Sequence, residues 1–551
     1  MLQYSWCVLG MKKVLLVLII TLAVSLRLYQ LGKVPVSMSD DEIRETVSSY
    51  SLWQTGRSVT GESYPLSFFL DDYTFTPVPI YLSAPFVGVL GLNMFSARLP
   101  YALMGILTVI AVYLLVKRLL KKEMPAILSA FVLAISVWHL QMSRFAVETT
   151  FALFFYTIGV YFFLGIEEKK HQLRSISLAA ISFFLAFHSY NATKIIYLPL
   201  LFILCIYEIR YLWRYRLTFA TIIFSVLFTA GSFFYMAKTQ NAARHGGQLF
   251  FFQDLKKAAW EVELKRRATK LPHTLSIIYY NKLTYWSDVF FHQYFYAFSP
   301  QYLFTDQEAN RIYSVGGGRG SLYLVEAPLI ILGLLGLSLL AKKQIWLILG
   351  ALVISPLPSA LSSGSPSYGM RSSFMLPWLA MLTASGICYL WTTIKPKLWR
   401  LIILIIIAII YLYLFTGYLT YYYYDWALIG AKYYSKSTKD MIMKVQKESK
   451  TQNNILITSA PNTILHYAFY KQIPANLIQV SYLKQEFIDK NVRFVNSCLG
   501  ITREDLRHLL LSNSLYLTSA LCYPDIPPDE KISTDDGESI WHLFFANAKN
   551  K

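Results

Sequence analysis

Eleven stretches of this chain are each long and apolar enough to cross a lipid bilayer, and they restrict the fold more than any other feature. A bilayer core needs roughly 20 mainly apolar residues per helix, and a helix satisfies its backbone hydrogen bonds internally. The stretches cover residues 14–31, 97–119, 125–141, 149–166, 175–190, 195–212, 217–235, 322–340, 344–361, 373–393 and 401–420. We therefore predict a polytopic α-helical membrane protein with about eleven transmembrane helices, which excludes soluble and fibrous proteins.

The basic residues indicate which helix ends face the cytoplasm. Lys12 and Lys13 precede the first stretch, and no small-residue cleavage site follows it, so we interpret it as an anchor with a cytoplasmic N-terminus. Every second connection is then short and basic, as cytoplasmic loops usually are. These connections contain Lys117, Arg118, Lys121, Lys122, Lys169, Lys170, Arg174, Arg210, Arg214, Arg216, Lys342, Lys343, Lys395, Lys397 and Arg400. The sequence predicts a multi-pass cell-membrane protein with an external C-terminus.

The net charge agrees with this topology. The chain has 51 basic and 32 acidic residues, a formal net charge of +19, which in a soluble protein would suggest nucleic-acid binding. Much of the excess lies in the predicted cytoplasmic loops, where it is a topology signal. We therefore predict membrane lipid as a partner, and no nucleic acid.

Residues 421–551 are predicted to form a small extracytoplasmic α/β domain beside a transmembrane domain of residues 1–420. The other predicted external segments are 32–96, 236–321 and 362–371. Strand patterns at 454–459, 492–496, 515–518 and 539–545 alternate with helical patterns at 462–472 and 503–512. Cys498 and Cys522 both fall in this segment, so we predict a disulfide between them, with two unpaired thiols as the alternative.

Three consecutive acidic residues, Asp40, Asp41 and Glu42, follow the first apolar stretch within about ten residues of the membrane surface. Acidic side chains are costly near lipid unless they have partners or a function. One interpretation is structural, with Ser39 or Asp40 capping a helix that extends to about residue 54. The other is catalytic, and the two are compatible because a cap fixes the next carboxylate at a helix start.

Several motifs make the chain similar to a known class of enzymes. An external DExR sequence, Asp41-Glu42-Ile43-Arg44, follows the first helix, and ARLP at 97–100, SRFAVE at 143–148, SYNATK at 189–194, FSPQYLF at 298–304 and GMRSSFMLP at 369–377 follow in order. In this order the sequence resembles the membrane-embedded GT-C glycosyltransferases. Within them it is most similar to the dolichyl-phosphate-mannose protein mannosyltransferases and the bacterial lipid A aminoarabinose transferases.

The resemblance implies the reaction. A monosaccharide would be transferred on the external side from a polyprenyl-phosphate donor to a protein, lipid or cell-surface glycan. The first-loop aspartate of the family is the expected base, and Asp41 matches it by position, with Arg44 in support. Asp40 is an extra acid beside the motif, so either Asp40 or Asp41 could be the base.

The chemistry of this transfer supports the same residues. A sugar on a lipid phosphate already has a good leaving group, so the acceptor hydroxyl chiefly needs a base and an in-line approach. One carboxylate is sufficient, and direct displacement inverts the anomeric carbon. The departing phosphate gathers negative charge, which requires nearby cations.

Four basic residues are predicted at the outer ends of helices, whereas basic residues usually gather at the cytoplasmic ends. These four are our candidates for binding the donor phosphate. They are Arg98, Arg144, Lys194 and Arg371. The alternative for each is snorkelling to lipid headgroups or pairing with an acid. Glu148, four residues after Arg144, is a candidate partner on the same helix face. Tyr190 either contacts the donor or acceptor or belongs to an interfacial aromatic belt.

A basic stretch with interleaved aromatic residues lies in the long external segment. It contains Lys256, Lys257, Trp260, Leu264, Lys265, Arg266, Arg267 and Lys270. The pattern is typical of an amphipathic helix on the outer leaflet, and also of a solvated charged helix face.

The leading hypothesis is therefore a membrane glycosyltransferase, and the alternative is a polytopic lipid or solute transporter. Transporters usually have internal repeats and ionisable groups near the midplane, whereas here no repeat is evident and the polar groups gather at one face. Asp71 and Asp72 form a second acidic pair that offers an alternative base or a metal site. No Cys/His or multi-carboxylate cluster supports a dedicated metal, and no cofactor is firmly implied.

Overall fold

The computed structural model describes residues 2–70, 73–168, 171–239, 250–306, 319–363, 369–458, 461–484, 488–495, 514–520, 522, 527–534 and 539–545. The chain divides into two compact units. Unit 1 comprises Met1–Tyr29 and Tyr101–Leu419, and unit 2 comprises Gln30–Pro100 and Thr420–Lys551. The first external segment, which the sequence predicts as part of the transmembrane domain, groups with the C-terminal segment in unit 2.

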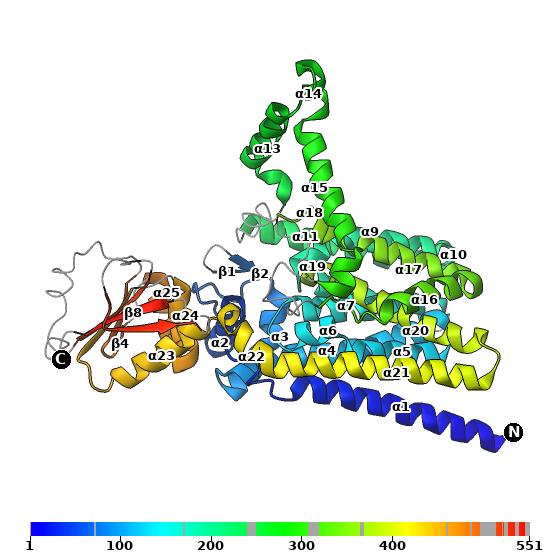
Figure 1. Cartoon of the computed structure of the whole chain (residues 1–551), viewed down its shortest axis with the longest axis horizontal. Coiled ribbons are helices and arrows are strands. Elements are labelled where there is room, and N and C mark those ends of the chain that lie inside the picture. The colour runs from blue at the N-terminus through cyan, green and yellow to red at the C-terminus, as the bar shows by residue number, and fades with distance from the viewer. Residues whose placement is uncertain are drawn as a thin grey trace. The chain divides into compact units, whose positions relative to one another are not determined.

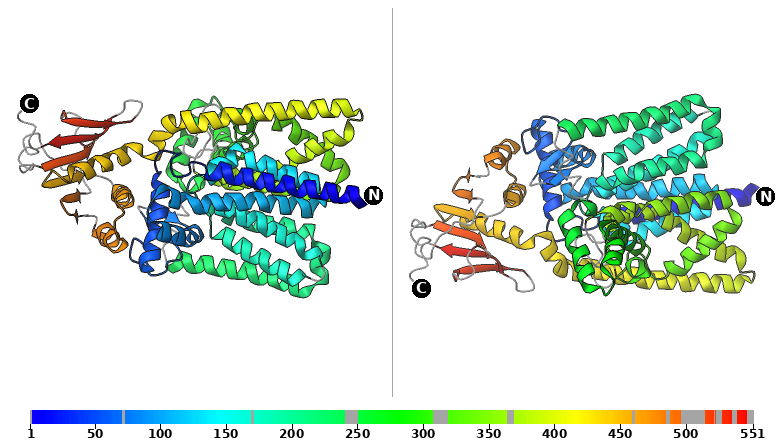
Figure 2. Two further views of the ribbon diagram at one scale, coloured as in Figure 1. Left: turned by 90° about the horizontal axis from the view of Figure 1, so that it is seen from below. Right: turned by 90° about the horizontal axis from the view of Figure 1, so that it is seen from above.

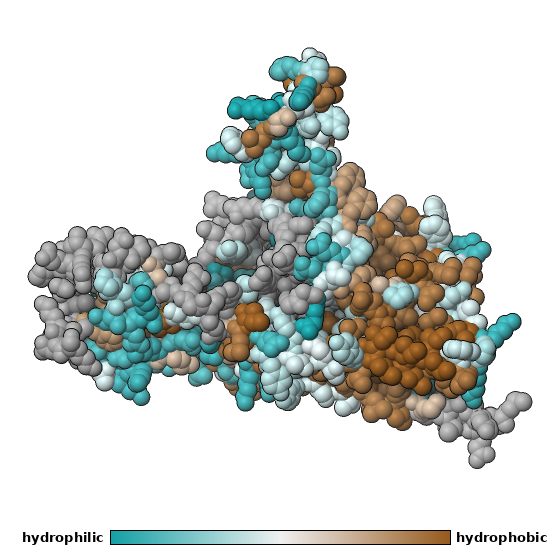
Figure 3. All heavy atoms as spheres, viewed as in Figure 1, coloured by the Kyte–Doolittle hydropathy of each residue, from teal (hydrophilic) through white to brown (hydrophobic). Residues whose placement is uncertain are grey.

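Unit 1 is a helical bundle whose main helices run side by side (Figures 1 and 2). Its helices are α1 (Leu2–Leu28), α4 (Met94–Leu120), α5 (Glu123–Ile135), α6 (Val137–Ser143), α7 (Thr149–Phe163), α8 (Gln172–Phe187), α9 (Asn191–Tyr207), α10 (Ile209–Arg214), α11 (Arg216–Thr239), α13 (Leu255–Ala268), α14 (His273–Tyr279), α15 (Lys282–Tyr296), α16 (Glu326–Leu340), α17 (Lys342–Ile354), α18 (Leu357–Leu361), α19 (Gly369–Ser372), α20 (Leu376–Thr393) and α21 (Lys397–Thr420). The face of the bundle seen in Figure 3 is broadly apolar, as lipid contact requires.

Every predicted apolar stretch coincides with helical structure. Among the described residues, six helices are long and apolar enough to span a membrane, or seven if a bent pair counts as one span. Four shorter apolar helices, at Pro77–Leu90, Gln172–Phe187, Asn191–Tyr207 and Glu326–Leu340, accompany them. A multi-pass membrane protein is confirmed, and the count of eleven spans stays a prediction.

The bent pair α5–α6 turns by 61° at Ser136, which frees backbone carbonyls inside the bundle. Arg27 Nη1 and Nη2 donate to the carbonyls of Ala134 and Leu133 at 3.2 and 3.4 Å. The Tyr323 hydroxyl donates to the carbonyl of Ile135 at 2.9 Å. A broken helix is tolerated in a membrane when such partners satisfy its free carbonyls.

Glycines allow close packing between helices α16 and α20. A Cβ atom at Gly333 would lie 2.0 Å from the carbonyl oxygen of Leu382, and one at Gly386 would lie 1.9 Å from that of Leu329. Any side chain would therefore force these helices apart. Small residues at such crossings are typical of packing in membranes, where van der Waals contact replaces the hydrophobic driving force.

Unit 2 combines the first external segment with the C-terminal segment. The first contributes α2 (Asp40–Thr55), β1 (Phe68–Leu70), β2 (Tyr73–Phe75) and α3 (Pro77–Leu90). The second contributes α22 (Trp426–Ile429), α23 (Lys436–Glu448), α24 (Pro461–Lys471) and α25 (Ala475–Lys484), with strands β3 (Asn454–Thr458), β4 (Ile488–Asp489), β5 (Val492–Val495), β6 (Ser514–Ser519), β7 (Glu530–Ser533) and β8 (Ser539–Phe545). Both segments contribute to one hydrophobic core, in which Ile43 and Val47 join Met441 and Ile442.

The C-terminal strands form a six-stranded sheet with the order β4-β5-β3-β6-β8-β7. Strand β3 pairs in parallel with β5 and β6, whereas β4, β7 and β8 pair antiparallel. All four predicted strands are present, and the predicted helix at 462–472 matches α24. The predicted helix at 503–512 lies outside the described residues.

Candidate active site

Helix α2 begins with a capping box that orders the three consecutive acids. Glu42 Oε2 accepts a hydrogen bond from the Ser39 backbone at 2.9 Å, and Ser39 Oγ accepts one from the Glu42 backbone at 3.3 Å. This is the predicted cap, formed by Ser39, and it places all three acids in the first turn. The three carboxylates nevertheless have different surroundings.

Glu42 forms a buried ion pair with Arg98. Arg98 Nε donates to Glu42 Oε1 at 2.9 Å, and neither side chain is exposed. The remaining Arg98 nitrogens donate to Glu42 Oε2 and to the carbonyls of Leu31, Pro35 and Ser37 at 2.6 to 3.4 Å. A guanidinium has five N–H groups, and these contacts use them all. Arg98 therefore holds the segment that connects α1 to α2.

Asp40 is held by the C-terminal segment. His466 Nε2 lies 2.8 Å from Asp40 Oδ1, and Ser435 Oγ donates to the same oxygen at 3.0 Å. Burial alone would raise the pKa of Asp40, but hydrogen bonds from His466 and Ser435 and the charges of His466 and Arg44 lower it well below its ordinary value. A carboxylate stabilised in its ionised form in this way is a poor proton acceptor.

Asp41 is as exposed as Asp40 but has a different partner. Arg44 Nη1 donates to Asp41 Oδ1 at 3.2 Å, while the Asp41 side chain is 41% exposed. The Arg44 guanidinium also lies over the Tyr73 ring, 4.8 Å from its centroid. Arg44 therefore orients the Asp41 carboxylate, which stays partly exposed.

Unit 1 contains a buried cationic group at the end of α1. Arg144 Nη1 donates to the carbonyls of Leu26 and Arg27 at 2.7 and 3.2 Å, and so caps the last turn of that helix. Arg27 Nη2 lies 2.7 Å from His139 Nδ1. Both arginines are almost completely buried. Arg144 and Glu148 flank the break between α6 and α7, so they do not share one helix face as the sequence suggested.

Four other predicted site residues come together in unit 1. Tyr190 interacts with both Arg371 and Glu148, and Glu148 interacts electrostatically with Lys194. Lys194 Nζ also donates to Asn191 Oδ1 at 2.6 Å. Glu148 precedes α7, Tyr190 and Lys194 lie at the start of α9, and Arg371 lies in α19, so only the folded bundle brings these three helix ends together. We call these four residues the Tyr190 cluster.

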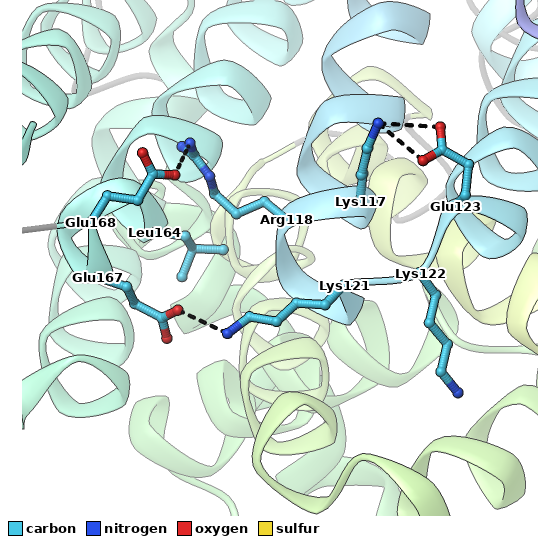
Figure 4. A pocket seen from close by; sticks show the side chains of 8 residues that line it. All are labelled: Lys117, Arg118, Lys121, Lys122, Glu123, Leu164, Glu167 and Glu168. Atoms are coloured by element: carbon cyan, nitrogen blue, oxygen red, sulfur yellow. Dashed lines mark hydrogen bonds and ion pairs between the residues drawn. The ribbon is translucent and has the colours of Figure 1, made fainter. Parts of the chain in front are cut away.

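A cavity of about 450 Å³ lies apart from these groups. It is lined by Lys117, Arg118, Lys121, Lys122, Glu123, Leu164, Glu167 and Glu168 (Figure 4). Three ion pairs, Lys117–Glu123, Arg118–Glu168 and Lys121–Glu167, join its walls at 2.9 to 3.2 Å. It lies at the Glu167 end of the span Thr149–Glu167, whereas Glu148 precedes the other end. Its cations belong to the predicted cytoplasmic loops.

The remaining predicted residues are partly outside the described chain. Cys522 is disulfide-bonded, while Cys498, Asp71 and Asp72 are not described, so the predicted pairing with Cys498 stays a prediction. Within the described ranges, no group of three or more His, Cys, Asp or Glu residues could hold a metal ion.

Part of the chain matches a family profile, and the fold is similar to that of solved structures. Residues 75–234 match the profile of a family described as Dolichyl-phosphate-mannose-protein mannosyltransferase. No curated protein sequence matches the chain. The structure is similar to apo ArnT from Cupriavidus metallidurans, with 12% identity, a TM-score of 0.51 and 99% of both chains covered. ArnT bound to undecaprenyl phosphate gives 13% identity and a TM-score of 0.50, with 98% of both chains covered.

A longer archaeal protein is also similar. The Archaeoglobus fulgidus oligosaccharyltransferase matches with 14% identity and a TM-score of 0.48. The match covers 83% of this chain but only 63% of the archaeal chain.

The fold and the profile match are those expected of the membrane-embedded GT-C glycosyltransferases. Within that class, the chain is similar to the dolichyl-phosphate-mannose-protein mannosyltransferases over residues 75–234 and to ArnT over nearly its whole length. The predicted resemblance and the predicted enzyme class are confirmed.

Sequence reasoning missed two groups at these sites. Arg27 lies inside the first apolar stretch, and an ionisable residue there is itself a signal, because such residues in membrane helices usually have a structural or functional partner. His466 gave no comparable signal. It is separated from Asp40 by 426 residues, and no local pattern connects them.

Proposed function

We propose that the chain transfers a monosaccharide from a polyprenyl-phosphate donor to a hydroxyl group of a protein, lipid or glycan on the external side of a cell membrane. The arrangement of the first-loop acids carries this proposal, because Glu42 is buried in an ion pair and Asp40 is held in its ionised form by His466 and Ser435, whereas Asp41 is partly exposed and contacts Arg44. The description of the matching family and the lipid phosphate bound in the ArnT structure support the choice of donor.

In the proposed reaction, Asp41 accepts the proton of the acceptor hydroxyl as its oxygen attacks the anomeric carbon. The bond from that carbon to the phosphate oxygen breaks, and the polyprenyl phosphate leaves with the electron pair. A single displacement of this kind inverts the anomeric carbon. Arg44 acts as a positioning residue through its hydrogen bond to Asp41.

For the donor phosphate, we propose Lys194 and Arg371 of the Tyr190 cluster, together with Arg144. Tyr190 and Glu148 support them by orienting Arg371 and Lys194. Arg98 is not among the proposed phosphate ligands, because its five N–H groups already donate to Glu42 and three backbone carbonyls. Cations positioned in a low-dielectric site stabilise the charge that develops on the leaving phosphate.

Replacing Arg371 with alanine is expected to weaken donor binding roughly 10- to 100-fold, the loss of one hydrogen bond between charged groups. The donor affinity of Arg371→Lys should lie between those of the wild type and Arg371→Ala, because lysine keeps the charge but not the planar pair of N–H donors. The dissociation constant of a polyprenyl-phosphate sugar, measured in detergent, checks this. Lys395→Ala, at an exposed position in a predicted cytoplasmic loop, is the matched control. Wild-type affinity in Arg371→Ala would exclude Arg371 from the phosphate site.

We further propose the orientation given by the basic loops, with a cytoplasmic N-terminus and an external segment 421–551. A reporter enzyme that is active only outside the cytoplasm should be active when fused after Lys551 and inactive when fused after Lys343. The opposite pattern would invert the topology and place Asp41 on the cytoplasmic side.

A further inference from the structure

An arm of three helices projects from the bundle in unit 1. Helices α13, α14 and α15 leave the bundle crosswise to its main helices in Figure 1, and both views of Figure 2 look along the arm. Arg266 Nε donates to the carbonyl of Tyr280 at 2.8 Å and braces α13 against the turn between α14 and α15. The arm therefore has a defined shape of its own.

Both ends of the arm are attached near one end of a membrane span. Helix α15 packs against α18, which ends at Leu361, and the Tyr294 hydroxyl near the end of α15 donates to the carbonyl of Val353 at 2.8 Å. Phe250, just before α13, forms a backbone bridge with Ser362. The span Lys342–Leu361 begins at two lysines and ends next to Ser362. An arm attached there and directed crosswise extends along the membrane surface at the Ser362 end.

The arm exposes large apolar side chains over its whole length. Trp260 is 63% exposed on α13, Ile278 is 66% exposed on α14, and Leu283 is 71% exposed on α15. Tyr279 and Phe295 are exposed as well. Soluble surfaces rarely display so many large apolar groups, so this surface has a partner.

Its charges indicate which partner. Seven basic and four acidic residues lie between positions 254 and 288, and two of the basic ones, Lys265 and Arg267, pair with acids of the arm. Lys256, Lys257 and Lys270 are exposed and form no ion pair among the described residues. Trp260 and Leu264 follow Lys256 at intervals of four, so cationic and apolar groups share one face of α13. This combination suits a headgroup region that contains anionic phosphates.

We propose that helices α13–α15 form a membrane-surface arm that lies in the leaflet at the Ser362 end of the bundle, with its apolar side chains inserted and Lys256, Lys257 and Lys270 bound to anionic lipid phosphates. This proposal for the arm does not rest on the proposed transfer reaction. It enlarges the contact of unit 1 with the bilayer beyond the transmembrane helices.

Photo-crosslinking tests the partner directly. The full chain carrying p-benzoylphenylalanine in place of Ile278 is placed in nanodiscs of phosphatidylcholine, with and without phosphatidylglycerol. We expect covalent lipid adducts by mass spectrometry, and more of them with phosphatidylglycerol. The same residue in place of Met443, an exposed position on α23, is the control and should give few adducts. Adducts at position 278 no more frequent than at 443, or crosslinks to a second protein copy, would overturn the proposal.

Neutralising the unpaired lysines tests the charge component. Lys256→Gln, Lys257→Gln and Lys270→Gln together should lower the lipid adduct yield at position 278 in phosphatidylglycerol nanodiscs at least about five-fold, the factor expected for one lost headgroup contact. The matched triple variant Lys447→Gln, Lys450→Gln and Lys490→Gln changes exposed lysines of unit 2 and should leave the yield unchanged. An equal yield from both triple variants would show that the lysines do not bind lipid phosphate.

Discussion

Asp41→Asn lowers the rate of glycosyl transfer roughly 10²- to 10⁴-fold while the donor still binds, if Asp41 is the base. Asparagine has nearly the same shape and can still accept a hydrogen bond from Arg44, but it cannot take a proton. The loss should therefore appear in kcat and not in donor affinity. Reconstitution with a polyprenyl-phosphate sugar, together with separate measurement of donor binding, distinguishes the two effects.

Asp40→Asn is the matched control, since it removes an equally exposed carboxylate one residue away. His466 and Ser435 stabilise the ionised form of Asp40, so this residue is expected to act structurally. Asp40→Asn should reduce the rate far less than Asp41→Asn. If the two variants lose equal activity, or if Asp40→Asn loses more, the base is not Asp41 alone.

The helical part of the fold could be predicted from the sequence because the bilayer imposes a simple length and composition requirement on every span. The stretch at 97–119 becomes helix Met94–Leu120, and the stretch at 373–393 becomes the span Gly369–Thr393. The bend at Ser136 could not be predicted in this way. Hydropathy reports the apolar character of residues 125–141 but not the arginine and tyrosine that satisfy the freed carbonyls.

Contacts between residues close together in the chain can be inferred from the sequence, whereas contacts between distant segments cannot. The cap by Ser39 and the contact between Asp41 and Arg44 follow from spacing along one helix. The pairing of Asp40 with His466 depends on a shared core that joins the first external segment to the C-terminal segment. The sequence predicts Arg98 at a helix end, but it does not show whether the guanidinium there binds a phosphate or pairs with an acidic side chain.

Removing Arg98 should have the largest effect on stability. Arg98→Met leaves the Glu42 carboxylate and the carbonyls of Pro35 and Ser37 buried without their donor. Breaking a buried ion pair by deleting one partner typically costs about 3–5 kcal/mol, because the remaining charge is uncompensated. We expect the free energy of unfolding, measured in detergent, to fall by that amount. Lys444→Met, which breaks the more exposed pair with Glu530, is the control and should cost at most about 1 kcal/mol.

The double variant Glu42→Gln/Arg98→Met separates the structural role from a ligand role. If Arg98 chiefly neutralises Glu42, the double variant should be more stable than Arg98→Met alone, since it no longer buries an unpaired carboxylate. Donor affinity, measured on whatever fraction remains folded, should then equal that of the wild type. A stable Arg98→Met protein with weakened donor binding would contradict the assignment and return Arg98 to the group of phosphate ligands. Because stability and donor affinity are measured separately, each of the two roles predicts a different pair of results.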